Sequence, residues 1–186
     1  MCRVSLQFAI LTALTEREST GIELTRRFDR AFGYFWSATH QQIYRELDRL
    51  HTNGLVAETT PQQSTGRGQP KRFAITPDGR DALRAWIAQV DKPSPPRDAL
   101  IVRVRAAAAT GEYESVRDAV AHHLGLHLEA IETYQEIERR DFSAVTTDAD
   151  RLRRLLLEAG LETERAQANW CREVLDTIDA IGRRDA

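Results

Sequence analysis

The sequence contains little cysteine and no long apolar run. Cys2 and Cys171 are the two cysteines among 186 residues, too few and too far apart for a disulfide framework or a Cys-X-X-Cys metal site. No apolar stretch approaches the roughly 20 residues that a membrane-spanning helix needs, and the residues after Met1 lack the pattern of a signal peptide. We therefore expect a cytoplasmic protein with reduced thiols and no membrane association.

Signatures of common enzyme classes are also missing. The chain has no glycine-rich nucleotide loop and no Gly-X-Ser-X-Gly nucleophile motif, and its carboxylates are spread along predicted exposed helix faces. His123 and His127 are spaced i, i+4 with His122 alongside, a spacing that can bind a transition metal. The sequence fixes no third ligand, and a polar outer helix face explains the same residues. We predict no enzymatic activity, no cofactor and no bound metal.

Charge is unevenly divided along the chain. Residues 1–90 contain 12 Lys and Arg against 9 Asp and Glu, whereas residues 91–186 contain 14 against 19. Only the first half is therefore suited to bind a polyanion such as nucleic acid.

The segment Phe35–Leu50 reads as one helix with two chemically opposite faces. Ile43, Leu47 and Leu50 form an apolar stripe at i, i+4 and i+7. The other side carries Gln41, Gln42, Arg45 and Arg49. Glutamine can pair with adenine, and arginine with guanine or phosphate, so this pattern is typical of a DNA-reading helix. A solvated helix face would show the same residues, so the neighbouring segments decide between the two readings.

A predicted hairpin follows this helix. Gly54 acts as a C-terminal stop, and residues 55–60 and 72–76 are short β-prone runs around a polar link over residues 61–71. No acidic residue occurs between Glu58 and Asp78, whereas the cations Arg67, Lys71 and Arg72 lie there. The pattern predicts a basic wing beside a polyanion.

Helical patterns flank the predicted helix and wing. The first helix is apolar on most sides, and we expect it to be buried, partly against a second subunit. Thr20 and Glu23 form a capping box for a second helix, whose core stripe is Leu24, Phe28, Phe32 and Phe35. Thr76-Pro77 opens a helix after the hairpin. Residues 1–91 are thus predicted to be a winged helix-turn-helix DNA-binding domain with a two-stranded wing.

Prolines 93, 95 and 96 mark a linker over residues 92–97. Residues 98–186 read as an all-helical dimerisation domain with two long antiparallel helices. Their apolar stripes cannot enclose a core alone, so a second copy is expected to complete a bundle. One stripe contains Val116, Val120, Leu124, Leu128, Ile131, Tyr134 and Ile137. The other contains Leu152, Leu156, Ala159, Ala166, Trp170, Val174, Ile178 and Ile181.

These motifs together resemble the PadR family of bacterial transcriptional regulators. The resemblance is carried by Trp36, Thr39–Leu47, Gly54-Leu55-Val56, Pro70-Lys71-Arg72-Phe73 and Thr76-Pro77-Asp78-Gly79. It covers nearly the whole chain, and Trp170 in Asn169-Trp170-Cys171 is similar to the longer, two-domain members. Arg45 departs from the family, because many members have proline after the tyrosine.

The resemblance implies a homodimeric repressor that binds double-stranded DNA at a palindromic operator and that a small aromatic effector releases. The predicted DNA contacts are Thr39, His40, Gln41, Gln42, Tyr44, Arg45, Arg49, Arg67, Lys71 and Arg72. The predicted dimerisation residues are Leu6, Ile10, Leu124, Leu128, Ile131, Leu156, Trp170, Val174 and Ile178. An effector cavity is expected near Trp170, Trp86 or Phe142. The alternative is a winged-helix assembly module, which would need neither exposed Gln and Arg nor wing cations.

Overall fold

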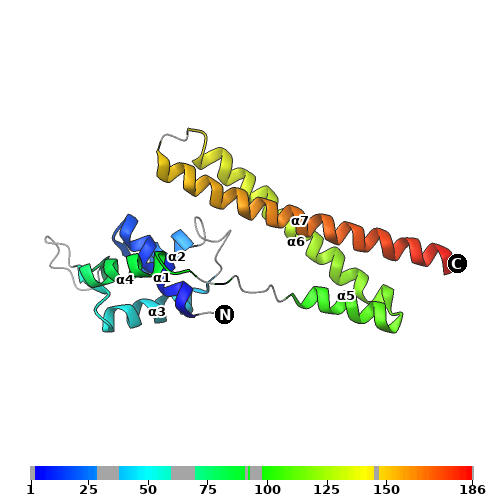
Figure 1. The fold of residues 1–186 in the computed structure, drawn as a ribbon, viewed down its shortest axis with the longest axis horizontal. Helices are drawn as coiled ribbons and strands as arrows, with labels where there is room; N and C mark the ends of the chain where they lie inside the picture. Colours follow the sequence, from blue (N-terminus) through cyan, green and yellow to red (C-terminus); the bar gives the residue numbers. More distant parts are fainter. Residues whose placement is uncertain are drawn as a thin grey trace. The chain divides into compact units, whose positions relative to one another are not determined.

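The fold is described from a computed structural model, which covers residues 3–28, 38–59, 70–90, 92, 98–144 and 147–185 (Figure 1). Phe32, Phe35, Trp36 and Arg67, together with Pro93–Pro96 of the predicted linker, lie outside the described residues. The chain divides into two compact units, residues 1–93 and 94–186. We call them the winged unit and the helical unit and describe each by itself.

In its described residues, the winged unit combines four helices with a small antiparallel sheet. Its elements are α1 (Arg3–Glu16), β1 (Ser19–Thr20), α2 (Gly21–Arg27), α3 (His40–Thr52), β2 (Val56–Thr59), β3 (Arg72–Ile75) and α4 (Pro77–Ile87). The strand order is β1-β3-β2, which confirms the predicted winged helix-turn-helix. Strand β1 was not predicted, because two residues are too short to show a period of alternation.

Local signals set most of the helix boundaries. The Thr20–Glu23 capping box opens α2, and Thr76 caps α4 with proline in its first turn, both as predicted. Gly54 adopts a positive φ of 71° just after α3, where the backbone N–H of Leu55 donates to the carbonyl of Leu50. The third helix, however, begins at His40 rather than Phe35, because the extended Thr39 caps it.

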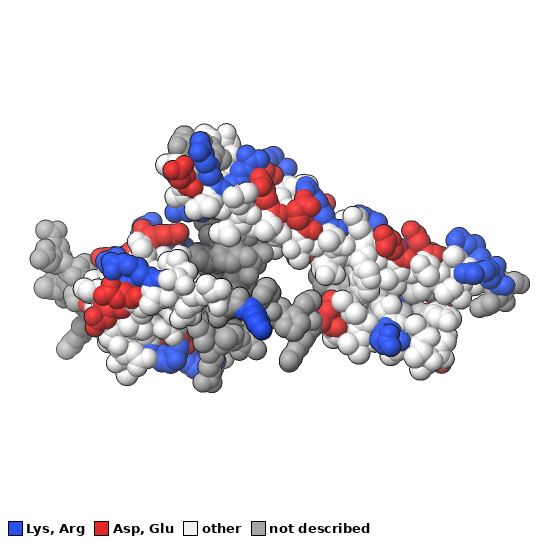
Figure 2. Space-filling view, in the orientation of Figure 1, with Lys and Arg blue, Asp and Glu red and all other residues white. Residues whose placement is uncertain are grey.

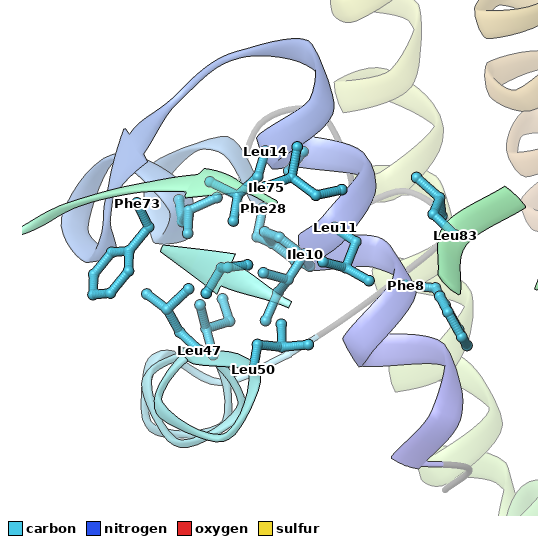
Figure 3. Close-up of a cluster of buried hydrophobic side chains, with 14 residues drawn as sticks. Phe8, Ile10, Leu11, Leu14, Phe28, Leu47, Leu50, Phe73, Ile75 and Leu83 are labelled. Atoms are coloured by element: carbon cyan, nitrogen blue, oxygen red, sulfur yellow. The ribbon is translucent and has the colours of Figure 1, made fainter. Parts of the chain in front are cut away.

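One apolar core holds the winged unit together (Figure 3). Side chains from α1, α2, α3, the sheet and α4 meet there, including Leu11, Phe28, Leu47, Phe73 and Leu83. The rings of Phe8 and Trp86 stack at its border, with centroids 4.5 Å apart. Two predicted dimerisation residues belong to this core.

Ile10 has no exposed surface, and Leu6 packs against the same cluster. Assigning Ile10 to a subunit contact was therefore wrong. A helix that is apolar on most sides is equally suited to be enclosed by its own domain, which is what happens to α1.

The helical unit contains α5 (Ala99–Thr110), α6 (Tyr113–Asp141) and α7 (Asp148–Asp185). Gly111, with a φ of 78°, ends α5 in the left-handed conformation that glycine tolerates. Arg117 near the start of α6 pairs with Asp179 near the end of α7, and Glu138 near the end of α6 pairs with Arg154 near the start of α7. The two long helices are therefore antiparallel, as predicted. No helix in the described ranges is both long and apolar enough to span a bilayer.

The buried stripe of α7 differs from the predicted one. Its buried residues are Leu157, Leu161, Ala168, Cys171 and Ile178. Leu152 and Leu156, which were assigned to the stripe, are 66% and 49% exposed. Adjacent leucines lie about 100° apart on a helix, so two offset stripes fit the same sequence, and packing against α6 selects the second.

A polar pair interrupts the contact between α6 and α7. His127 Nδ1 lies 2.5 Å from Glu164 Oε2, and both side chains are only about one-fifth exposed. The prediction that His127 sits on a polar outer face was wrong, because its helix face is the one that contacts α7. Within the described part of the chain, no group of three metal-ligating side chains occurs.

Candidate nucleic-acid interface

Helix α3 is anchored by one face and presents the other to solvent. Ile43, Glu46, Leu47 and Leu50 are buried, which confirms the predicted apolar stripe. Of the predicted DNA contacts on this helix and its cap, Thr39, His40, Gln41, Tyr44, Arg45 and Arg49 are exposed, and Gln42 is partly buried. The intramolecular bonds of each side chain decide which of them can reach a ligand.

Gln42 belongs to the cap of α3. Its Oε1 accepts a hydrogen bond from the Thr39 backbone N–H at 2.9 Å, and the Thr39 hydroxyl accepts from the Gln42 backbone N–H at 3.3 Å. Bidentate pairing with adenine needs both the oxygen and the nitrogen of the amide. Such pairing would open the capping box, so the assignment of Gln42 as a base reader conflicts with its position. The Thr-X-X-Gln spacing of residues 39 and 42 is the sequence pattern from which this capping box could have been predicted.

Arg49 is also bound within the protein. Its guanidinium contacts both carboxylate oxygens of Glu46, and Nη2 donates to Gln7 Oε1 on α1 at 2.9 Å. This clamp fixes α3 to α1 and compensates the buried Glu46 carboxylate. The structure therefore gives Arg49 a positioning role in place of the predicted base contact.

Tyr44 packs at the junction of α2 and α3. A Cβ atom added to Gly21 would lie 2.3 Å from the Tyr44 ring, so the two helices approach closely only because residue 21 is glycine. The Tyr44 side chain is still 42% exposed. It therefore both spaces the two helices and leaves part of its surface at the predicted interface.

Acidic side chains neutralise the two described wing cations. Lys71 Nζ lies 2.9 Å from Glu58 Oε2, and this hydrogen bond raises the pKa of Lys71, with a smaller contribution from Asp48. Arg72 donates to the Glu18 carbonyl at 2.9 Å and to Glu23 Oε1 at 3.1 Å. The inference of an unopposed basic wing was wrong for these two residues, because the fold brings Glu58 to Lys71 and Glu23 to Arg72.

The Glu23 carboxylate links the α2 cap to this network. The Thr20 backbone N–H holds the pKa of Glu23 below its ordinary value of 4.5, and Arg72 lowers it further. Because the folded-state pKa is depressed, the stabilisation is complete above pH 4.5 and is lost as the pH falls through the lower folded value.

We expect Glu23→Gln to be less stable than the native protein at neutral pH and equal to it at strongly acidic pH, since glutamine keeps a cap acceptor but loses the charge. Urea unfolding at pH 7 and pH 3 measures this difference. A stability gap that stays constant between the two pH values would contradict the ionic role of Glu23.

Two predicted base readers remain available. Gln41 and Arg45 are exposed, lie four residues apart on one face of α3, and make no hydrogen bond or ion pair with any other described residue. Figure 2 shows Lys and Arg atoms along the edge of the winged unit where Figure 1 places α3. An amide and a guanidinium without internal partners can form bidentate bonds to base edges.

The predicted dimerisation residues of the helical unit do not form one surface. Ile178 is buried among α5, α6 and α7, and Leu124, Trp170 and Val174 pack against the same cluster. Leu128 and Leu156 are 37% and 49% exposed, and Ile131 is partly buried. Assigning Ile178 to a subunit contact was wrong, because its side chain completes the core of its own unit.

Comparison with known proteins matches both units. The model of the PadR-like transcriptional regulator family covers residues 10–85, and the model described as virulence activator alpha C-terminal covers residues 96–179. The probable transcriptional regulator Rv1176c of Mycobacterium tuberculosis is 36% identical, across 94% of this chain and 98% of that protein.

Solved structures show the same architecture. The Vibrio cholerae virulence activator AphA aligns with a TM-score of 0.79 and 32% identity, across 95% of this chain and 99% of its own. Bacillus subtilis PadR in complex with operator DNA aligns with a TM-score of 0.75 and 26% identity, across 94% and 99% of the two chains. The complex of the same protein with p-coumaric acid aligns with a TM-score of 0.73 and 25% identity, across 94% of this chain and 98% of its own.

Proposed function

Because the chain belongs to the PadR-like family of transcriptional regulators, we propose that it is a homodimeric repressor that binds an inverted-repeat operator. The observation that carries this proposal is the solvent face of α3, where Gln41 and Arg45 have no internal partner among the described residues. The operator complex of B. subtilis PadR and the description of that protein as a negative regulator support DNA binding and repression.

Exposed apolar surface on the helical unit supports the dimer. Among the described residues of this unit, seven large apolar side chains are at least 37% exposed: Ile101, Val102, Leu126, Leu128, Leu152, Leu155 and Leu156. Helix α5 is apolar on most sides, yet only Leu100 and Ala107 are buried. A helix of this composition is normally enclosed, and a second copy of the chain would supply the missing surface.

A symmetric dimer constrains the operator. Two copies of α3 must lie about 34–36 Å apart to enter successive major grooves on one face of the duplex. The half-sites should therefore be centred about one helical turn apart and related by a two-fold axis.

The proposal is tested by selecting bound fragments from the DNA upstream of the protein's own gene. Affinity is then measured against the selected site and a scrambled site at two salt concentrations. A palindromic site that is bound far above the scramble supports a specific dimeric regulator. Equal, weak and salt-sensitive binding to both would favour a winged-helix module that assembles with other proteins.

Loss of Lys71 should affect all DNA sequences alike. We expect Lys71→Ala to weaken selected and scrambled sites by the same factor and to lower the salt slope by no more than about one, as for a single phosphate contact. The Glu58 ion pair should reduce the effect, because DNA must compete with it. Fluorescence anisotropy over a salt series measures both quantities. Loss of sequence preference in this variant would mean that the wing reads bases.

We also propose that a small aromatic effector releases the operator, as a ligand that favours another spacing of the recognition helices would do. The p-coumaric acid complex of B. subtilis PadR supports an effector of this size. Of the three aromatic residues expected near the cavity, Trp170 lines a pocket in the helical unit. Trp86 instead stacks on Phe8 at the border of the winged unit's core.

A further inference from the structure

The helical unit contains an open apolar cavity between α5, α6 and α7. Its volume is about 320 Å³, within the range of small-molecule sites. The small side chains of Ala107 and Ala108 leave space on the α5 side of the cavity. Val116 on α6 and Val174 on α7 line its other sides. All lining residues belong to one compact unit, so the cavity does not depend on the position of the winged unit.

Two aromatic side chains border this cavity. Trp170 on α7 and Tyr113 at the start of α6 are partly buried, and both also pack against the core of the unit. Packing against that core holds each of them in place. Aromatic rings attract cations through the negative potential of their faces, and tryptophan does so most strongly.

Among the residues that line the cavity, one has a charged side chain, and that residue, Glu173, is acidic. Glu173 lies one helical turn after Trp170 and makes no ion pair with another described residue. A second pocket of about 240 Å³ shares Tyr113 with the first and adds Glu112 and Glu114. No lysine or arginine lines either pocket. The nearby guanidinium of Arg117 is already bound to Asp179 at 3.0 Å.

We propose that this cavity binds a lipophilic aromatic cation, such as a quaternary ammonium compound carrying one ring. The ring would occupy the apolar space beside Ala107 and Ala108, and the cationic head would lie between Trp170 and Glu173. An aromatic carboxylate is disfavoured, because its charge would meet the Glu173 carboxylate without a compensating cation in the lining. The claim that such a cation is the effector that releases the operator rests on the proposed function. The claim that the cavity binds such a cation does not depend on it.

Three ligands of similar size test the proposal on the full-length protein. The cation is benzyltrimethylammonium, the uncharged isostere is neopentylbenzene, and the anion is 3-phenylpropanoate. Isothermal titration calorimetry in the absence of DNA should show the cation binding about 2- to 30-fold more tightly than the isostere, the range of a cation–aromatic contact. The anion should bind more weakly than both. Equal affinity for the cation and the isostere would overturn the proposal.

Matched variants locate the site. Glu173→Gln should weaken the cation alone, and Ala108→Leu should fill the cavity and abolish binding of all ligands. Ala109→Leu is the control, because Ala109 is exposed on the same helix and does not line the cavity. Cation binding that survives Ala108→Leu, or is unchanged by Glu173→Gln, would refute the site. If no ligand binds and Ala108→Leu dissociates the dimer, a second copy fills the groove and the proposal fails.

Operator release is measured separately. Addition of benzyltrimethylammonium should dissociate a preformed complex with the selected operator, and it should not do so for Ala108→Leu. If calorimetry shows binding while the operator complex persists, the cavity is a ligand site and its effector role is refuted. If no operator is found at all, the proposed function fails while the calorimetric result still stands.

Discussion

Gly79→Ala is expected to destabilise the winged unit by about 2–4 kcal/mol, the upper range of overpacking substitutions. A Cβ atom at this position would lie 2.1 Å from the Leu55 carbonyl oxygen and 2.9 Å from Ile75 Cγ1. The first of these is a backbone atom beside β2, so it cannot move aside as a flexible side chain would. Helix α4 would have to shift away from the sheet, and the core around Leu83 would open.

Urea unfolding followed by tryptophan fluorescence measures this effect. A Trp170→Phe background removes the tryptophan of the helical unit, so the signal reports the winged unit alone. Gly125→Ala is the control, because nothing lies within 4 Å of its added Cβ in the described structure. Because Gly125 lies in the helical unit, Gly125→Ala should leave this signal unchanged, although alanine in the middle of α6 should stabilise the helical unit by about 0.5–1 kcal/mol. A Gly79→Ala protein as stable as the parent would show that α4 does not pack on Leu55 as described.

Arg45→Ala is expected to reduce affinity for the selected operator by about 1–3 kcal/mol, or about 5- to 150-fold, and to relax specificity at one base pair of each half-site. The guanidinium has no internal partner among the described residues, so its removal deletes a DNA contact without breaking a packing interaction. Arg49→Ala should differ, because it releases Glu46 and Gln7 and therefore lowers the stability of the protein.

Fluorescence anisotropy with the selected and scrambled sites distinguishes the two kinds of contact. A base contact weakens the selected site far more than the scramble, whereas a phosphate contact weakens both by the same factor. Arg103→Ala, an exposed arginine on α5, is the matched control for loss of one positive charge. Unchanged affinity in Arg45→Ala would remove this residue from the interface and leave Gln41 as the base reader to test.

Much of the fold follows from short-range patterns in the sequence. The apolar stripe of α3, the Thr20–Glu23 box, the Thr76-Pro77 start and the Gly54 stop all depend on residues within one or two turns of each other. These signals are local because helix geometry repeats every 3.6 residues and caps act on the nearest free N–H groups. They suffice to order the elements and to identify the winged helix-turn-helix.

The sequence was less informative about which charged side chains are free of ion pairs within the protein and can therefore contact DNA. Glu58 reaches Lys71, and Glu23 reaches Arg72, across separations of 13 and 49 residues. Lys71 and Arg72 were interpreted as free cations, because no acidic residue stands next to them in the chain. Strand pairing and helix packing create these two ion pairs, so only the tertiary structure reveals that Arg72 is bound while Arg45 has no partner among the described residues.

The tertiary structure also decided between alternative ways to bury the same apolar residues. Leu156 and Leu157 satisfy helical stripes of nearly equal quality, and the contact with α6 buries Leu157. Ile10 fits a subunit contact or a domain core equally well by its chemistry, and the fold encloses it. The sequence by itself therefore determined most of the helices and strands, their order and the winged helix-turn-helix architecture. The tertiary structure decided burial, charge pairing and the cavity beside Trp170, because these depend on residues brought together from distant parts of the chain.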